Sequence, residues 1–190
     1  MWALVESGNV TKIYKNPKQI TIGDIQYPSN IFMLWTSSDL EAIGIYEVVI
    51  DNTNLKNDEY YINTNQSFAF GSGKVTATFG TATAKDLDDS TDSGGNVIRG
   101  LKYTHSQTID SEAYSLLQPN DWMVVRNAES SKAIPSDWLD YRVAVRTAAT
   151  DMKTKINAVA NVDALADLYK YNDANPPVRP LGEFPTEPSS

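Results

Sequence analysis

Apolar and polar residues alternate through much of the first 85 residues, and this pattern predicts β-strands. The segment WALVESGNVTKIY (residues 2–14) has apolar residues on both sides of a Ser-Gly-Asn turn at positions 7–9, which is typical of a hairpin. Residues 19–27 repeat the pattern around a Gly-Asp turn, and residues 75–79 alternate valine, alanine and phenylalanine with threonine. We therefore expect a small β-rich N-terminal domain over residues 1–85 that acts as a docking domain.

A short helix is expected to interrupt these strands. Ser37 or Ser38 is placed to cap it, and Gly44 is placed to end it. The compact β run IYEVVI follows at residues 45–50.

Residues 86–100 break the strand pattern with an acidic, glycine-bearing sequence, and we predict a loop or linker there. Asp88 would begin a calcium loop of the EF-hand type, but that motif needs glycine at position 93 and glutamate at position 99. The chain has Ser93 and Arg99 there. A solvated acidic loop is therefore the preferred interpretation.

The apolar spacing then changes to a helical period over residues 101–170, which we interpret as a helical module. One helix is predicted over residues 108–118, a second near Asp121, and the longest from Pro135-Ser136. The longest has a nearly heptad apolar stripe, formed by Trp138, Tyr141, Val145, Ala148, Met152, Ile156 and Val159. Residues 171–190 are proline-rich and are expected to form an extended tail. The predicted fold class is α+β.

The composition of the chain argues against some classes of function. The 190 residues carry a formal net charge of −8, which argues against a general nucleic-acid binder, since such proteins need a basic surface. The chain has no cysteine, and we see neither a secretory signal nor an apolar run of the ~18 residues that a membrane span needs. We expect a protein that is made in the cytoplasm, without a membrane partner.

Motifs with catalytic potential are weak. The single histidine, His105, is expected to be a surface or capping residue, because it lies near the junction of a loop and a helix. No nucleophile-elbow glycines surround any serine, which argues against a serine triad. The sequence GSGKVT at residues 71–76 has Phe68 and Val75 where a phosphate-binding loop needs glycine and a hydroxyl residue, so a hairpin turn is favoured. We predict no enzyme activity, no catalytic residue, no metal site and no cofactor.

One small pattern occurs twice: an Asp-Trp pair followed by an arginine four positions after the tryptophan. The copies are Asp121, Trp122 and Arg126, and Asp137, Trp138 and Arg142. Residues four apart are neighbours on a helix, so each arginine is predicted to lie over its tryptophan in a cation–π contact. Each aspartate is predicted to lie in the first helical turn, and Glu129 is placed to pair with Arg126. These features indicate packing or interface anchors: Trp122, Arg126, Glu129, Trp138, Tyr141, Arg142 and Arg146.

The spaced set of residues around these units resembles the phage tail assembly chaperone and tail-fibre accessory family of tailed bacteriophages. The matching positions are Leu117, Pro119, Asp121, Trp122, Arg126, Glu129, Pro135, Tyr141, Arg142 and Arg146. The motif carries its information as a spaced set, since each element alone is common. The resemblance covers about residues 1–51 and 110–168.

This resemblance implies a protein that works by binding other phage tail proteins, and it transfers no catalytic residue. We expect a structural protein of the virion tail, as a tail-fibre, baseplate or adaptor component, that forms a homo-oligomer. The heptad-like stripe is a candidate surface for joining copies. The alternative is a tail or tail-fibre assembly chaperone that is absent from the mature virion.

Overall fold

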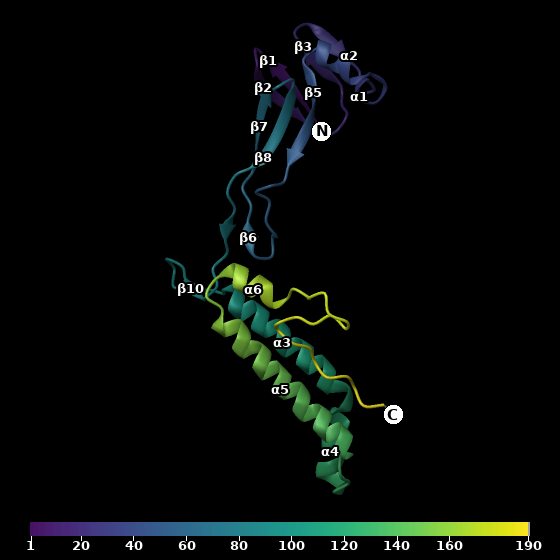
Figure 1. The fold of residues 1–190 in the computed structure, drawn as a ribbon, viewed down its shortest axis with the longest axis vertical. Coiled ribbons are helices and arrows are strands. Elements are labelled where there is room, and N and C mark those ends of the chain that lie inside the picture. The colour runs from purple at the N-terminus through teal and green to yellow at the C-terminus, as the bar shows by residue number, and fades with distance from the viewer. Residues whose placement is uncertain (190) are drawn as a thin grey trace. The chain divides into compact units, whose positions relative to one another are not determined.

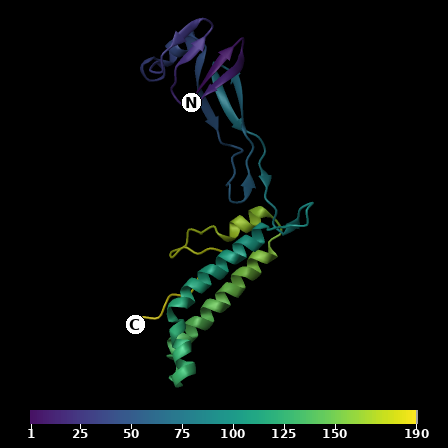
Figure 2. The ribbon, with the colours of Figure 1, turned by 180° about the vertical axis from the view of Figure 1, so that it is seen from behind.

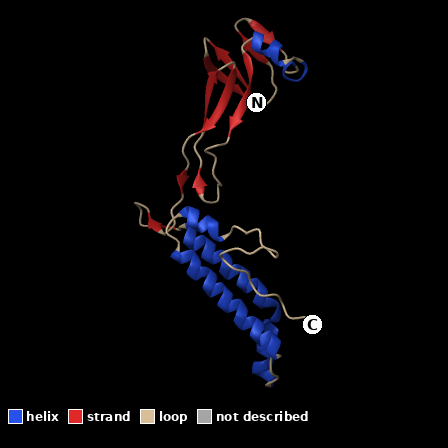
Figure 3. Cartoon of the chain, in the orientation of Figure 1, coloured by secondary structure: helices blue, strands red, loops and turns tan. Residues whose placement is uncertain are grey.

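A computed structural model describes residues 1–189 of the chain. Strands and helices are both present, which confirms the predicted α+β class (Figure 3). The chain divides into two compact units, Met1–Thr83 and Ala84–Ser190, and each is described separately below.

The first unit contains a five-stranded curled sheet with the strand order β2-β1-β5-β8-β7 (Figure 1). All neighbouring strands are antiparallel except β5 and β8, which are parallel. The elements up to the end of this unit are β1 (Trp2–Glu6), β2 (Asn9–Tyr14), β3 (Ile20–Ile22), β4 (Ile25–Tyr27), α1 (Ile31–Leu34), α2 (Ser37–Ala42), β5 (Ile45–Asp51), β6 (Tyr61–Ile62), β7 (Gln66–Gly71), β8 (Lys74–Phe79) and β9 (Thr83–Ala84).

Two-residue turns explain why the predicted hairpins form. Ser7-Gly8 joins β1 to β2 and Ser72-Gly73 joins β7 to β8, and all four residues have positive φ angles between 51° and 78°. Turns with two positive φ angles match the twist of the strands that they join. The GSGKVT segment is therefore a hairpin turn, as predicted.

The sheet buries apolar residues on both of its faces, because successive strand residues point to opposite sides. On β1, Leu4 belongs to one hydrophobic cluster with Ile31, Phe32 and Ile45, while its neighbour Ala3 belongs to another. That second cluster contains Ala3, Val48, Val75 and Ala77. Helix α1 supplies Ile31 and Phe32, and the sequence pattern gave no sign of this four-residue helix.

The cap of α2 differs from the prediction by one residue. Thr36 is the N-cap, and its hydroxyl accepts from the Asp39 amide at 3.2 Å while the Asp39 carboxylate accepts from the Thr36 amide at 3.1 Å. This reciprocal capping box satisfies two amides at once, so it is favoured over a lone serine cap at Ser37 or Ser38. After the helix Gly44 has a φ of +80°, and a side chain there would lie 2.9 Å from the Val5 carbonyl oxygen.

The second unit is built on two long helices that lie side by side, α3 and α5 (Figures 1 and 2). Its elements are β10 (Ser90–Thr91), β11 (Val97–Ile98), α3 (Leu101–Leu117), a 3-10 turn (Gln118–Asn120), α4 (Asp121–Ser130), α5 (Ser136–Ala158) and α6 (Val162–Leu168). No helix within residues 1–189 has both the length and the apolar character that crossing a membrane requires.

Residues 86–100, predicted as a loop or linker, contain the β10–β11 hairpin and pack onto the start of α3. The Asp86 and Leu87 carbonyls accept from the Leu101 and Lys102 amides, each at 2.9 Å. Asp89 accepts from the Gly100 amide at 2.9 Å, and this bond, followed by the Arg99 side chain, lowers the pKa of Asp89. The first amides of a helix need such acceptors from outside the helix, and this segment supplies them.

The apolar stripe predicted for α5 is buried against α3 of the same chain. Tyr141, Val145, Met152 and Ile156 are buried as predicted, whereas Ala149 is buried in place of Ala148, which is partly buried. The facing residues of α3 are Leu101, His105, Ile109 and Ala113. This seam is therefore filled within one chain, and it is not a free surface for joining copies into a bundle.

After α6, residues 169–189 contain no helix or strand, yet the segment contacts the helices. Leu181 is 1% exposed, and its amide donates to the Leu168 carbonyl at 2.9 Å. The Lys155 ammonium donates to the carbonyls of Pro180 at 2.8 Å and Leu181 at 3.0 Å.

Two substitutions on α5 test whether the α3/α5 seam is the core of this unit. Ile156 is 0% exposed, so Ile156→Ala should lower the free energy of unfolding by about 2–5 kcal/mol. Val143 lies on the same helix but is 55% exposed, so Val143→Ala should change it by less than about 0.5 kcal/mol. Urea unfolding of the full chain, followed by circular dichroism of the helices, measures both. Equal effects would contradict the assignment of the core.

Candidate functional site

The junction between α3, α4 and α5 contains most of the predicted anchor residues, and Arg142 is at its centre. This side chain is 4% exposed and comes from the second turn of α5. Its Nη2 donates to Asp121 Oδ1 at 2.7 Å, and its Nη1 donates to the Leu117 carbonyl at 3.1 Å and to the Asn120 side-chain oxygen. One guanidinium thus binds the end of α3, the 3-10 turn and the first residue of α4.

This geometry corrects the prediction that Arg142 lies over Trp138. A buried guanidinium has five N–H donors that need acceptors, and a tryptophan face offers no lone pair. The α3–α4 turn offers a carbonyl, an amide oxygen and a carboxylate together. Trp138 instead meets Tyr141 edge to face, with ring centroids 5.9 Å apart.

The first Asp-Trp-Arg unit has the predicted cation–π contact. The guanidinium carbon of Arg126 lies 4.7 Å from the centroid of the Trp122 ring. Arg126 Nε is buried without a hydrogen-bond partner among the described atoms. Arg126 and Glu129 form no ion pair in the described chain, so the predicted pairing is wrong.

The other anchors divide between the core and the surface. Tyr141 is buried, Trp138 is partly buried, and Arg146 and Glu129 are exposed. Arg146 donates to the Arg142 carbonyl at 3.3 Å, close to the upper limit for a hydrogen bond. Asp121 and Asp137 both lie in the first turn of their helices, as predicted.

Helix α4 is the surface element of this site, because none of its ten residues is buried in the described structure. Its exposed side chains include Trp122 at 53%, Val125 at 53% and Val124 at 42%. Trp122 and Val125 are three positions apart and therefore lie on neighbouring parts of one face. A helix of this length is marginal alone in water, so it depends on contacts outside itself.

Asn120 is a buried residue of this junction that was not among the predicted anchors. It is 2% exposed, donates to the Leu116 carbonyl at 3.2 Å and accepts from Arg142. The only signal for it was its place after Pro119, between two predicted helices. Its position marks the turn, but its partner is 22 residues away in the sequence.

Two further candidates for chemistry were the single histidine and a metal site. His105 is 7% exposed on α3, and its Nδ1 lies 2.8 Å from the Tyr169 hydroxyl, so it is a core residue and not the expected surface or capping residue. The described residues contain no group of three or more metal-ligating side chains.

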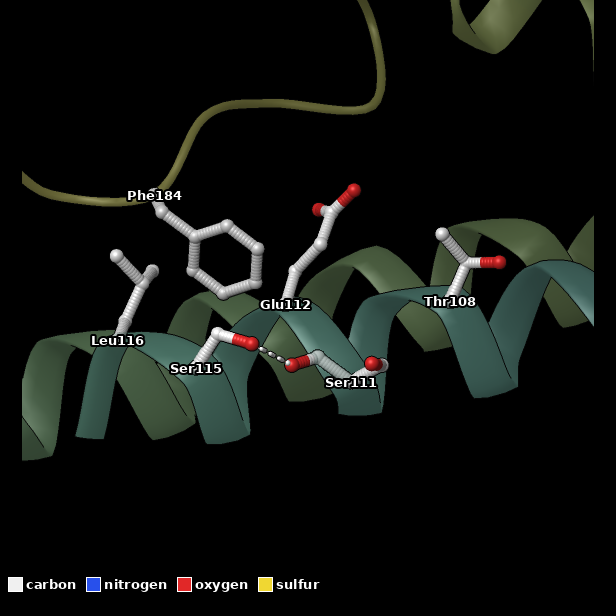
Figure 4. A pocket seen from close by; sticks show the side chains of 6 residues that line it. All are labelled: Thr108, Ser111, Glu112, Ser115, Leu116 and Phe184. Atoms are coloured by element: carbon white, nitrogen blue, oxygen red, sulfur yellow. Dashed lines mark hydrogen bonds between the residues drawn. The ribbon is translucent and has the colours of Figure 1, made fainter. Parts of the chain in front are cut away.

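An open groove of about 520 Å³ runs along α3 (Figure 4). It is lined by Thr108, Ser111, Glu112, Ser115, Leu116 and Phe184. The Ser115 hydroxyl donates to the Ser111 carbonyl at 2.9 Å, so it is engaged with the helix backbone. The groove pairs no nucleophile with a base.

Comparisons with known protein families, with curated protein sequences and with solved structures gave no match to this chain. The resemblance to phage tail proteins therefore stays a prediction, and the function has to be argued from the chain itself.

Exchanging each arginine for methionine tests the different roles of the two units. Arg142→Met leaves the buried Asn120 oxygen and the Leu117 carbonyl without the Arg142 donor. The free energy of unfolding should therefore fall by about 2–4 kcal/mol. The half-exposed Asp121 contributes little to this cost, because water can solvate it. Arg126→Met should cost less than about 1 kcal/mol.

Urea unfolding of both variants gives the comparison. An Arg126 variant as unstable as the Arg142 variant would contradict the division between a core unit and a surface unit.

Proposed function

We propose that this chain is a non-enzymatic structural protein of a phage virion tail, acting through contacts with other tail proteins. The observation that carries the proposal is α4, a helix whose apolar face has no covering partner within the described chain. The spaced motif that resembles phage tail proteins includes Trp122 and Arg126 of this helix. The proposal places the protein in the virion tail as a tail-fibre, baseplate or adaptor component.

The chemistry of α4 suits a protein interface. Tryptophan and arginine are enriched among residues that dominate binding energy, because they combine a large apolar area with polar groups. Arg126 already lies against Trp122, so a partner would meet a partly ordered surface. Arg142 fixes the start of α4, which lowers the entropy lost when a partner binds.

A homo-oligomer is part of the proposal, but its contact has to lie outside the α3/α5 seam. Leu139 offers apolar surface on α5 and is 49% exposed. We assign contacts between copies to this side of α5.

We also propose that the proline-rich tail is extended where it follows the helices. Leu181 contacts Lys155, and Glu187 lies close enough to Tyr141 to raise the pKa of that phenol, although burial raises it more. Fourteen helical positions separate Lys155 from Tyr141, or about 21 Å of helix, and the six residues from Leu181 to Glu187 span about 20 Å only when extended.

The direct test is mass spectrometry of gradient-purified phage particles with absolute quantification of this chain. The proposal expects a constant copy number per particle that matches the symmetry of the tail. Abundance in infected cells with absence from particles would overturn it in favour of the alternative, a tail or tail-fibre assembly chaperone.

Trp122→Ala tests the role of α4 in assembly. Trp122 is about half exposed, so the substitution should lower the stability of the free chain by less than about 1 kcal/mol. Incorporation into particles should fall by about tenfold or more, as expected for a residue that anchors an interface. Tyr114→Ala is the matched control, because Tyr114 is 61% exposed on α3 and should have no effect on incorporation. Normal incorporation of the Trp122 variant would contradict the assignment of α4.

A further inference from the structure

Two open spaces, one along α3 and one along α5, border residues 183–185 of the C-terminal segment, and together they are called the groove here. On α5 it is lined by Val143, Ala144, Thr147 and Ala148 together with Asp140 and Asp151, and the space there is about 450 Å³. On α3 the lining includes Glu112 among hydroxyl residues, and that space is about 520 Å³. Neither space has a lysine or arginine among its lining residues.

The carboxylates along this groove are not neutralised. Glu112, Asp140 and Asp151 are exposed and form no ion pair in the described chain. Carboxylates concentrated along one groove create a negative potential that attracts cations and repels anions. The lining of the groove therefore carries negative charge that no ion pair balances.

The chain's own C-terminal segment lies in the groove but does not fill it. Phe184 lies over α3 next to Leu116 and Glu112 (Figure 4), and Pro185 lies beside Ala148 of α5. The segment also brings Glu187, which adds negative charge, whereas Glu183 is paired with Arg179 at 2.9 Å. The spaces along α3 and along α5 both remain open beside it.

A helix fits this space better than an extended segment does. A helix with its side chains is about 10 Å wide, and the groove between two packed helices is the position that a third helix takes in a bundle. Alanine, serine and threonine side chains in the floor allow its close approach. We propose that this groove binds a basic, amphipathic helix of a partner protein, which displaces residues 183–189.

The proposed helix would place apolar residues over Ala144 and Ala148 and lysine or arginine residues against Asp140, Asp151 and Glu112. This is recognition of a helix in a groove, with apolar anchors and charges at the edge that steer the approach. The inference concerns the α3/α5 groove and not α4, so it is independent of the proposed place of the protein in a phage tail.

Two synthetic helical peptides with the same leucine positions test the proposal on the full chain. One carries lysine and the other glutamate at the remaining positions, and binding is measured by fluorescence anisotropy. The lysine peptide should bind and the glutamate peptide should not. The double variant Asp140→Lys/Asp151→Lys should weaken binding by about tenfold or more, while Asp173→Lys, on an exposed loop, should change it by less than about twofold.

Releasing the C-terminal segment gives the second part of the test. Phe184→Ser should strengthen binding of the lysine peptide several-fold, since the displaced segment competes less. The control is Val178→Ser, at an exposed position of the same segment that does not line the groove, and it should have no effect. Circular dichroism checks that each variant is folded.

Three results would overturn the proposal. They are equal binding of the two peptides, an equal loss of lysine-peptide affinity in the Asp140→Lys/Asp151→Lys and Asp173→Lys variants, or weaker binding of the lysine peptide to Phe184→Ser. The second would mean that the peptide responds to net charge alone. The third would mean that Phe184 belongs to the binding surface and does not block it.

Discussion

The hydrogen bonds of Arg142 are the interaction on which the helical unit depends. Removing a guanidinium from water is costly unless each donor finds an acceptor, and the turn between α3 and α4 provides three acceptors within a few residues. The same bonds hold α4 in place, although α4 buries no residue of its own. A buried arginine on one helix therefore determines where an exposed helix lies.

The use of the long apolar stripe limits how this protein can assemble. Because α3 covers the stripe of α5, the surfaces of the helical unit that remain for contacts include the face of α4, the side of α5 at Leu139 and the groove under the C-terminal segment. The first two are apolar and the third is acidic. These surfaces differ in chemistry, so one chain has room for more than one kind of partner.

Local signals in the sequence predicted much of the fold, whereas contacts between distant residues were missed. The hairpin turns at Ser7-Gly8 and Ser72-Gly73 and the helix period of α5 depend on neighbouring residues, and the structure confirms them. Among the anchors, the Arg126 contact with Trp122 lies within one helix and was found. The bonds of Arg142 join positions 21 to 25 residues apart, so spacing along one helix led to the wrong partner. The acidic hairpin before α3 was missed for the same reason, since its role is to supply acceptors to a helix that begins later in the chain.

Amide hydrogen exchange of the free chain tests the central claim most directly, namely that α4 is held at its start by Arg142 and otherwise awaits a partner. We predict slow exchange in α3 and α5, where the core residues lie, and much faster exchange over residues 121–130 of α4. The last turn of α4 should exchange faster than the first, because Asp121 is the residue bonded to Arg142. Protection of α4 equal to that of α5 in the free monomer would contradict the account.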